Sequence, residues 1–250
     1  METKTLSLAQ VRDLAKTWLV DAGMDAQGSD VLADLATMSE RDGPRSHGLR
    51  MLPVYKQSFE CGYATPAAQP TVARVAPGVL RGDGDNGYFQ IAMEAARQQL
   101  LDVARQQGIA GYTCANCHHL AALRFDTMAL ADEGLIAIAM VNALKLIVPH
   151  GGDKPIFGTN PMSFACPREG ADPIVWDQSS SVVALMDIKM AAAEGHMLDV
   201  YGGLDPDGNV TKDPVAITET LSLLPFAAHK GTGIALMVEI LGAALAGGTL

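Results

Sequence analysis

The sequence predicts a mixed α/β protein, and three observations lead to this class. Apolar residues recur at helical spacing through the first 60 residues. Beyond residue 70, short strand-like runs alternate with turns and further helical patterns. The 250 residues are 48% hydrophobic and 18% charged, enough to bury a substantial core in one large domain or two small ones.

The N-terminal region, residues 1–70, is predicted to be helical. Ser7 and Gln10 form a capping box before an apolar stripe. A second helix is expected from Ser29 to just before Gly43. A third is expected over residues 49–61, with its proline near the first turn.

Residues 71–250 are predicted to form a second, sheet-containing region. TVARVAPGVLRGD indicates a hairpin that turns at Pro77–Gly78, and the long helix after it closes at Gly108. IAGYT, LIAIAMV, MSFAC and PIVW are expected strands, with a helix near residues 182–194. Residues 231–250 are almost wholly apolar, but Glu239 in a bilayer centre would cost about 2.5–3.5 kcal/mol or more, which favours a buried core helix.

Composition excludes several classes of function. Eighteen basic and 28 acidic residues give a net charge of −10, which argues against a nucleic-acid surface. Four cysteines in a chain of this length do not indicate a disulfide scaffold, and the charged N-terminus is unlike a signal peptide. We expect a cytoplasmic protein that spans no membrane.

GDGDNG, residues 82–87, matches the G-x-G-x-x-G pattern of dinucleotide-binding loops. Asp83 and Asp85 would lie in the anion site and repel a pyrophosphate. The preceding segment also resembles a polar hairpin more than a buried parallel strand. We therefore interpret this stretch as an ordinary turn.

CANCHH, residues 114–119, contains C-x-x-C-H, the spacing of covalent haem attachment. Cys114, Cys117 and one of the two following histidines could also supply three zinc ligands. No second pair completes a tetrahedron, although Cys61 and Cys166 remain available. We favour cysteines packed as small hydrophobic residues and expect no metal.

The chain has six histidines, and four of them stand beside glycine or another histidine in SHG, CHHLAA, PHGG and AHKG. Glycine lets the backbone approach a ligand closely, so these stretches are candidate site loops. They do not by themselves identify a reaction.

A series of unusual stretches occurs in one order: RDGPRSHG, CHHLAAL, MVNALKLIVPHGG, FGTNPMSFACPR, PIVWDQSSS, MDIKMAAAEG, DPDGNVT, LLPFAAHKG and MVEILGAALAGG. Through these stretches the sequence resembles the malate/L-lactate dehydrogenase-type family of NAD(P)-dependent 2-oxo acid and imine reductases. The resemblance extends from about residue 10 to the end of the sequence. Within this family it is most similar to reductases of cyclic imine carboxylates. The resemblance implies a non-Rossmann, largely antiparallel NAD(P)-binding sheet domain packed with the helical region.

The resemblance implies that His47 protonates the substrate, and that Ser46 and Asp187 complete a charge-relay group. The residue types suit this chemistry, because hydride delivery to C2 of an imine or 2-oxo acid leaves a nitrogen or oxygen that needs a proton. A carboxylate partner would support the basicity of an imidazole at a helix N-terminus.

The resemblance also implies NADPH as cofactor, with NADH as the alternative, and a substrate contact at Thr159. Lys230 suits a cofactor phosphate. The implied cofactor contacts are His119, Leu120, Ala121, Ala122, Leu123, Asp177, Gln178, Ser179, His229 and Lys230.

The sequence departs from the family pattern in three places. The arginine that usually binds the substrate carboxylate is replaced by Met51, and Arg50 or Arg45 is expected to substitute for it. Ala227–Ala228 stands where relatives carry two glycines. The family's chains also continue past Leu250, so the chain is expected to be C-terminally shortened.

Together these features predict an NADPH-dependent reductase that converts Δ1-piperideine-2-carboxylate to L-pipecolate and Δ1-pyrroline-2-carboxylate to L-proline. The alternatives are a lactate- or malate-type 2-oxo acid dehydrogenase and a truncated, catalytically silent family member. The family resemblance also implies a homodimer.

Overall fold

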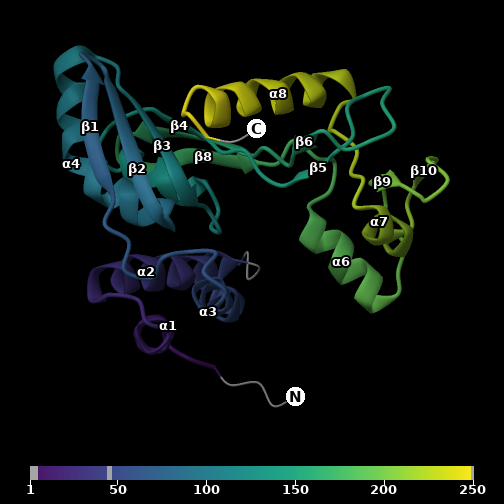
Figure 1. Ribbon diagram of the computed structural model, residues 1–250, viewed down its shortest axis with the longest axis horizontal. Helices are drawn as coiled ribbons and strands as arrows, with labels where there is room; N and C mark the ends of the chain where they lie inside the picture. The colour runs from purple at the N-terminus through teal and green to yellow at the C-terminus, as the bar shows by residue number, and fades with distance from the viewer. Residues whose placement is uncertain (1–4, 44–46, 249–250) are drawn as a thin grey trace. The chain divides into compact units, whose positions relative to one another are not determined.

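The computed structural model describes residues 5–43 and 47–248 (Figure 1). The chain divides into two compact units, Met1–Asp126 and Thr127–Leu250, and each contains its own hydrophobic cluster. The mixed α/β class is confirmed. The predicted boundary after residue 70 divides the helical region that carries the SHG motif from the region assigned to the cofactor and substrate. This boundary stays a prediction.

The predicted N-terminal helices form, and their end signals act as expected. Ser7 and Gln10 make the reciprocal capping box, and Gly43 ends the second helix with a φ of 103°. The second helix begins before Ser29, because the Asp25 side chain caps it by accepting from the Gly28 N–H at 2.7 Å. The helices are α1 (Leu8–Asp21), α2 (Ala26–Asp42), the 3₁₀ turn η2 (Leu49–Met51) and α3 (Leu52–Glu60).

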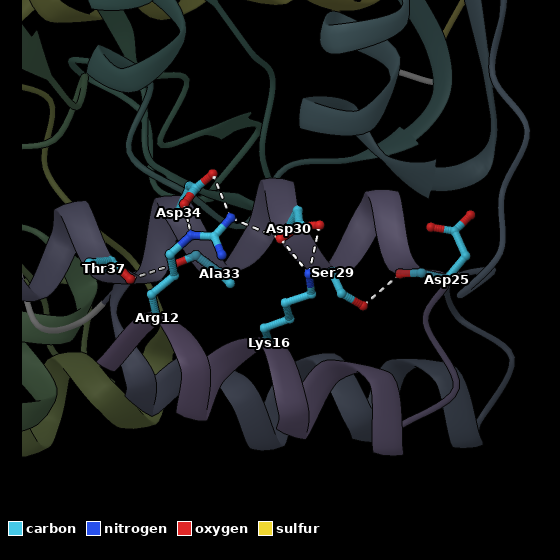
Figure 2. A network of polar contacts seen from close by, with 8 residues as sticks. All are labelled: Arg12, Lys16, Asp25, Ser29, Asp30, Ala33, Asp34 and Thr37. Atoms are coloured by element: carbon cyan, nitrogen blue, oxygen red, sulfur yellow. Dashed lines mark hydrogen bonds and ion pairs between the residues drawn. The ribbon is translucent and has the colours of Figure 1, made fainter. Parts of the chain in front are cut away.

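Ion pairs join α1 to α2 on their exposed side (Figure 2). Arg12 contacts Asp30 at 2.8 Å and Asp34 at 2.5 Å, and Lys16 contacts Asp30 at 2.8 Å. Hydrogen bonds from Lys16 and then Arg12 hold the pKa of Asp30 below its usual value. Exposed pairs add little stability. The apolar cluster between the helices, which includes Leu19, therefore holds them together.

The first unit continues with a three-stranded sheet and one long helix. The predicted hairpin turns at Pro77–Gly78, and the long helix ends at Gly108, whose φ is 80°. Strand order is β1–β2–β3, with β1 antiparallel and β3 parallel to β2. The elements are β1 (Thr71–Ala76), β2 (Val79–Tyr88), α4 (Phe89–Gln107) and β3 (Gly111–His118).

The parallel pairing of β2 and β3 through α4 corrects the expectation for GDGDNG. These residues lie inside β2 rather than in a turn, around a bulge in which Asp85 and Asn86 have positive φ. They therefore do not form a phosphate-binding loop before the helix. Gly82, Gly84 and Gly87 instead leave room for side chains, because an added Cβ there would collide with Tyr112, Cys117 and Ala68, respectively.

The second unit is built from antiparallel strands, as predicted, in the sheet β4–β7–β8 and the pairs β5–β6 and β9–β10. Its hydrophobic core contains Leu146, Ile147, Ile188, Ile217 and Leu223. The elements are α5 (Arg124–Ala131, which begins in the first unit), β4 (Ala137–Met140), β5 (Lys145–Ile147), β6 (Phe157–Gly158), β7 (Met162–Arg168), β8 (Ala171–Gln178), α6 (Leu185–Glu194), β9 (Gly203–Leu204), β10 (Val210–Thr211), α7 (Pro214–Thr220), α8 (His229–Glu239) and the π-helical turn η3 (Ile240–Ala244).

The apolar C-terminal segment forms α8 and η3, as the helix prediction requires. Ala235 and Val238 on α8 are fully buried. Among the described residues, no helix combines the length and hydrophobicity needed to cross a bilayer.

Candidate active site

His47 lies in the short turn that leads from α2 into η2, and it is half-buried. Glu40, near the end of α2, accepts a hydrogen bond from the backbone N–H of Leu49 at 2.9 Å. Its side chain lies against Gly48, where an added Cβ would collide with it. Glu40 therefore holds the turn that carries His47. Ser46 and Arg45 lie outside the described residues.

Positions 50 and 51 have different surroundings. Arg50 is exposed, whereas Met51 is half-buried and packs against the N-terminal apolar cluster. Successive residues of a 3₁₀ turn point about 120° apart, so one position faces the cluster while its neighbour faces away. The methionine therefore has a packing role at its position, and Arg50 is free of that role.

His119 forms a buried pair with Asp126. Its Nε2 lies 2.9 Å from a carboxylate oxygen of Asp126, and the two side chains are 6% and 8% exposed. The His119 ring also lies 5.7 Å from that of Phe89, between ring centroids. This imidazole is oriented by a carboxylate on one side and by an aromatic ring on the other.

The residues after His119 are anchored to the N-terminal helices. Leu120, Ala121 and Ala122 pack against the apolar cluster, and Leu123 is 3% exposed. Arg124 binds Asp42 at 3.1 Å, which ties this segment to the end of α2, where the loop to His47 departs.

In the second unit, the structure brings Thr159 and Ser179 together. The Thr159 carbonyl oxygen accepts from the Ser180 N–H at 2.8 Å and from the Ser179 hydroxyl at 3.2 Å. Asp177 and Gln178 end β8 just before these serines and are exposed. One predicted substrate contact and three predicted cofactor contacts thus lie on two adjoining loops.

Asn160 joins these loops to α8. Its side chain is fully buried, its backbone φ is 36°, and its amide nitrogen donates to the Ala235 carbonyl oxygen at 2.8 Å and to Glu239 at 2.6 Å. The amide oxygen accepts from the Ala143 N–H at 3.1 Å, and the backbone carbonyl accepts from the Ser180 hydroxyl at 2.9 Å. This arrangement fixes the residue beside Thr159.

The loop before α8 is hydrogen-bonded to the serine-containing loop that follows β8. The Phe226 N–H donates to the Ser180 carbonyl at 3.0 Å, and His229 and Lys230 are the first two residues of α8, both exposed. Ala227 and Ala228 have φ values of 45° and 56°, which residues other than glycine rarely adopt. The chain therefore enters α8 through a strained turn.

Asp187 lies in the first turn of α6 and is exposed. His47 belongs to the first unit and Asp187 to the second, and Ser46 is outside the described residues. The charge-relay group of these three residues therefore stays a prediction.

Sequence reasoning missed four residues of these sites: Glu40, Asp126, Asn160 and Glu239. Asp126 could have been found, because it follows His119 by seven residues at a helix start. Asn160 stands inside the quoted FGTNP stretch, but only the fold shows that its side chain points at Glu239. Glu40 carries no sequence signal for its contact with the His47 turn.

The two cysteines of CANCHH lie on β3, are half-buried and are free thiols. Over residues 5–43 and 47–248, no group of three or more His, Cys, Asp or Glu side chains has a metal-binding arrangement. The expectation that this stretch holds neither zinc nor haem stays a prediction.

Comparison with known proteins identifies relatives along nearly the whole chain. The family model for malate/L-lactate dehydrogenase matches residues 6–250. A Delta(1)-pyrroline-2-carboxylate/Delta(1)-piperideine-2-carboxylate reductase of Pseudomonas syringae pv. tomato is 42% identical over 98% of this chain and 72% of its own length. A Pseudomonas putida enzyme of the same name is 45% identical over 87% of this chain and 64% of its own length.

Solved structures of relatives superpose closely on this chain. The crystal structure of delta1-piperideine-2-carboxylate reductase from Pseudomonas syringae superposes with a TM-score of 0.96 at 42% identity, over 99% of this chain and 74% of that one. A putative malate/lactate dehydrogenase from E. coli superposes with a TM-score of 0.93 at 28% identity, over 99% of this chain and 70% of that one. The chain thus belongs to the malate/L-lactate dehydrogenase family of oxidoreductases.

Proposed function

We propose that this protein reduces cyclic imine carboxylates, Δ1-piperideine-2-carboxylate to L-pipecolate and Δ1-pyrroline-2-carboxylate to L-proline. The observation that carries the proposal is its 42% identity, over 98% of the chain, to a reductase named for both imines. Two further relatives named for the pyrroline substrate, from Burkholderia ambifaria and Burkholderia multivorans, are 37% and 35% identical.

In the proposed reaction a bound nicotinamide cofactor supplies hydride to C2 of the imine. His47 donates its imidazole proton to the ring nitrogen, as a general acid does. Glu40 holds the turn that carries His47, which supports a fixed position for the imidazole. We propose that Asp187 and Ser46 complete a charge-relay group with His47, and that Thr159 contacts the substrate.

The residues around α8 fit a phosphate-bearing cofactor. The N-terminal end of a helix attracts anions, and Lys230 adds a positive charge in the first turn of α8. Gly231 packs so closely on the backbone of Phe226 that a side chain would collide there, so the helix start is held firmly. We propose that His229, Lys230, the 177–179 segment and the 119–123 segment hold NADPH in preference to NADH.

Reduction of a 2-oxo acid is the second candidate. A (2R)-3-sulfolactate dehydrogenase (NADP(+)) of Chromohalobacter salexigens is 36% identical over 98% of this chain. Both candidates use the same hydride and proton transfers.

We further propose that the protein is a cytoplasmic homodimer. Its four cysteines are free thiols, as in reducing compartments. The outer face of α8 and η3 exposes Leu236, Ile240 and Leu245 by 47%, 51% and 61%, which supports burial against a second subunit. Light scattering at several protein concentrations tests the subunit number.

The decisive experiment follows NADPH oxidation with Δ1-piperideine-2-carboxylate, Δ1-pyrroline-2-carboxylate, pyruvate and 3-sulfopyruvate side by side. We expect kcat/KM to be highest with one of the two imines. A higher value with a 2-oxo acid would favour the second candidate, and no turnover with any substrate would contradict both. Repeating the assay with NADH tests the cofactor preference.

A further inference from the structure

The two motifs that the proposed reaction does not use lie side by side in the first unit. GDGDNG is part of β2, CANCHH is part of β3, and the two strands run parallel. Gly82 is opposite Cys114, and Gly87 is opposite Cys117. The glycines of one motif therefore face the cysteines of the other.

Cys114 and Cys117 are brought together by a break in β3. In a regular strand, residues three apart point to opposite faces. Here Asn116 has a φ of 52° and the ladder shifts register next to it, so the alternation is interrupted. The Cys117 thiol donates to the Cys114 carbonyl oxygen over 3.7 Å, which brings the two side chains near enough to affect each other's protonation.

The glycines of β2 make the room that this pair needs. An added Cβ at Gly84 would collide with the Cβ of Cys117, and one at Gly82 would collide with the Tyr112 ring. The Tyr112 hydroxyl donates to the Ala92 carbonyl oxygen at 3.2 Å, which holds the ring over Gly82, the residue opposite Cys114. The spacing of glycines in β2 and cysteines in β3 thus builds one half-buried dithiol site with a phenol beside it.

The two thiols are electrostatically different. The neighbouring Cys117 thiol and then the Tyr112 hydroxyl lower the pKa of Cys114, against the effects of burial and of the nearby Asp83 carboxylate. The neighbouring Cys114 side chain and burial raise the pKa of Cys117. A low-pKa thiol beside a protonated one is the usual arrangement of an attacking and a resolving cysteine.

We propose that Cys114 and Cys117 form a redox site: hydrogen peroxide converts the dithiol to an intramolecular disulfide, and a thiol reductant returns it to the dithiol. The Cys114 thiolate attacks the peroxide oxygen, which gives a sulfenic acid and releases water once the leaving hydroxide takes a proton. The Cys117 sulfur then attacks the Cys114 sulfur and the hydroxyl leaves as a second water. The cysteines lose two electrons in all, and the peroxide gains them.

The site adjoins the segment assigned to the cofactor, and this part of the inference rests on the proposed function. Cys117 is followed by His118, whose Nε2 lies 3.0 Å from the Asn86 amide oxygen, and by His119 of the pair with Asp126. A disulfide draws β3 together immediately before these histidines. Oxidation is therefore expected to weaken NADPH binding.

Disulfide formation is tested first, without cofactor. The full-length protein is treated with hydrogen peroxide, alkylated with iodoacetamide and digested with trypsin, which releases both cysteines in the peptide of residues 106–124. We expect this peptide to become two hydrogen masses lighter and unalkylated, and to regain both alkylation sites after dithiothreitol. A peptide that stays fully alkylated, or one trapped as a single sulfinic acid, overturns the proposal.

The variants Cys114→Ser and Cys117→Ser separate the two roles, and Cys61→Ser and Cys166→Ser are matched controls. Cys117→Ser should accumulate a sulfenic acid at Cys114 that dimedone traps, whereas Cys114→Ser should leave Cys117 unreactive. The two controls should form the disulfide as the unaltered protein does. Equal dimedone trapping at either thiol overturns the assigned roles.

Coupling to the cofactor is measured separately, by NADPH titration of the reduced and oxidised protein. We expect the Kd to rise on the order of fivefold or more on oxidation, and to stay unchanged in Cys114→Ser under the same treatment. A disulfide that leaves the Kd unaltered overturns the coupling alone. If the reduced protein binds no NADPH, the proposed function fails, while the peptide analysis still decides the redox site.

Discussion

The side-chain amide of Asn160 donates a 2.6 Å hydrogen bond to the carboxylate of Glu239. Asn160 follows Thr159, whose carbonyl oxygen holds Ser179 and Ser180, and Glu239 is the last residue of α8. A single buried side chain thus links the loop of a predicted substrate contact to the helix of predicted cofactor contacts. This link gives the Glu239 carboxylate a hydrogen-bond partner within an otherwise apolar stretch, residues 234–245.

We expect Asn160→Ala to lower the free energy of unfolding by about 2–3 kcal/mol, because it leaves buried groups without their partners. Urea unfolding measures this loss. Glu239→Gln keeps a hydrogen-bond acceptor and should cost clearly less, which makes it the matched control. An Asn160→Ala protein as stable as the original would show that water replaces the amide.

The proposed proton donor is tested by His47→Ala. Loss of a general acid should reduce kcat by about 10²–10⁴-fold, while the Kd for NADPH stays near its original value. His196→Ala removes an exposed imidazole after α6 and serves as the control. Unaltered turnover in the His47 variant would show that the proton comes from another group.

The position of the substrate carboxylate is tested at residues 50 and 51. Met51→Arg should lower the KM for the imine acid, because an arginine fork there can bind a carboxylate bidentately. It should also lower stability by about 1 kcal/mol, since Met51 packs against the N-terminal cluster.

Met51→Gln, which has a similar length and no charge, controls for the lost packing, and Arg50→Ala tests the proposed substitute. If KM changes in neither Met51→Arg nor Arg50→Ala, the carboxylate is bound elsewhere.

The strained turn before α8 gives a stabilising substitution. Ala228 has a φ of 56° and a ψ of −118°, so Ala228→Gly should raise the free energy of unfolding by about 1 kcal/mol. Thermal unfolding measures the gain. Ala95→Gly, at an exposed helical position in α4, should instead destabilise by about 1 kcal/mol. Equal losses at both positions would mean that the turn is not strained.

The stretch CANCHH is expected to bind neither zinc nor haem. Elemental analysis of the purified protein should find substoichiometric metal, and its absorption spectrum should lack a Soret band. Stoichiometric zinc that disappears in Cys114→Ser would contradict both this prediction and the dithiol assignment.

The parts of the fold that depend on neighbouring residues were predictable. The capping box of Ser7, the stops at Gly43 and Gly108, and the Pro77–Gly78 hairpin all appear as expected, because each signal acts within a few residues. The parallel pairing of β2 with β3 was missed. A strand that joins a hairpin on one edge and a parallel neighbour on the other shows a mixed pattern, which local periodicity does not distinguish.

The candidate site was predictable only in part. Resemblance to the family proposes Thr159, Ser179 and Lys230 as site residues, because short motifs recur in order, and these assignments stay predictions. It did not indicate the partners that orient them, since Asn160 and Glu239 are 79 residues apart and meet only in the folded chain. Asp126 lies outside the CHHLAAL stretch, and its pairing with His119 forms only once the chain turns into α5.

The β2–α4–β3 arrangement also determines the order in which the first unit can assemble. β1 and β2 need only close the Pro77–Gly78 turn, and hairpins of this kind form within microseconds. β3 can add to β2 only after α4, whose 19 residues separate them, has folded back along the sheet. Until then β2 presents an unpaired edge, so the segment that carries both cysteines is among the last parts of this unit to become ordered.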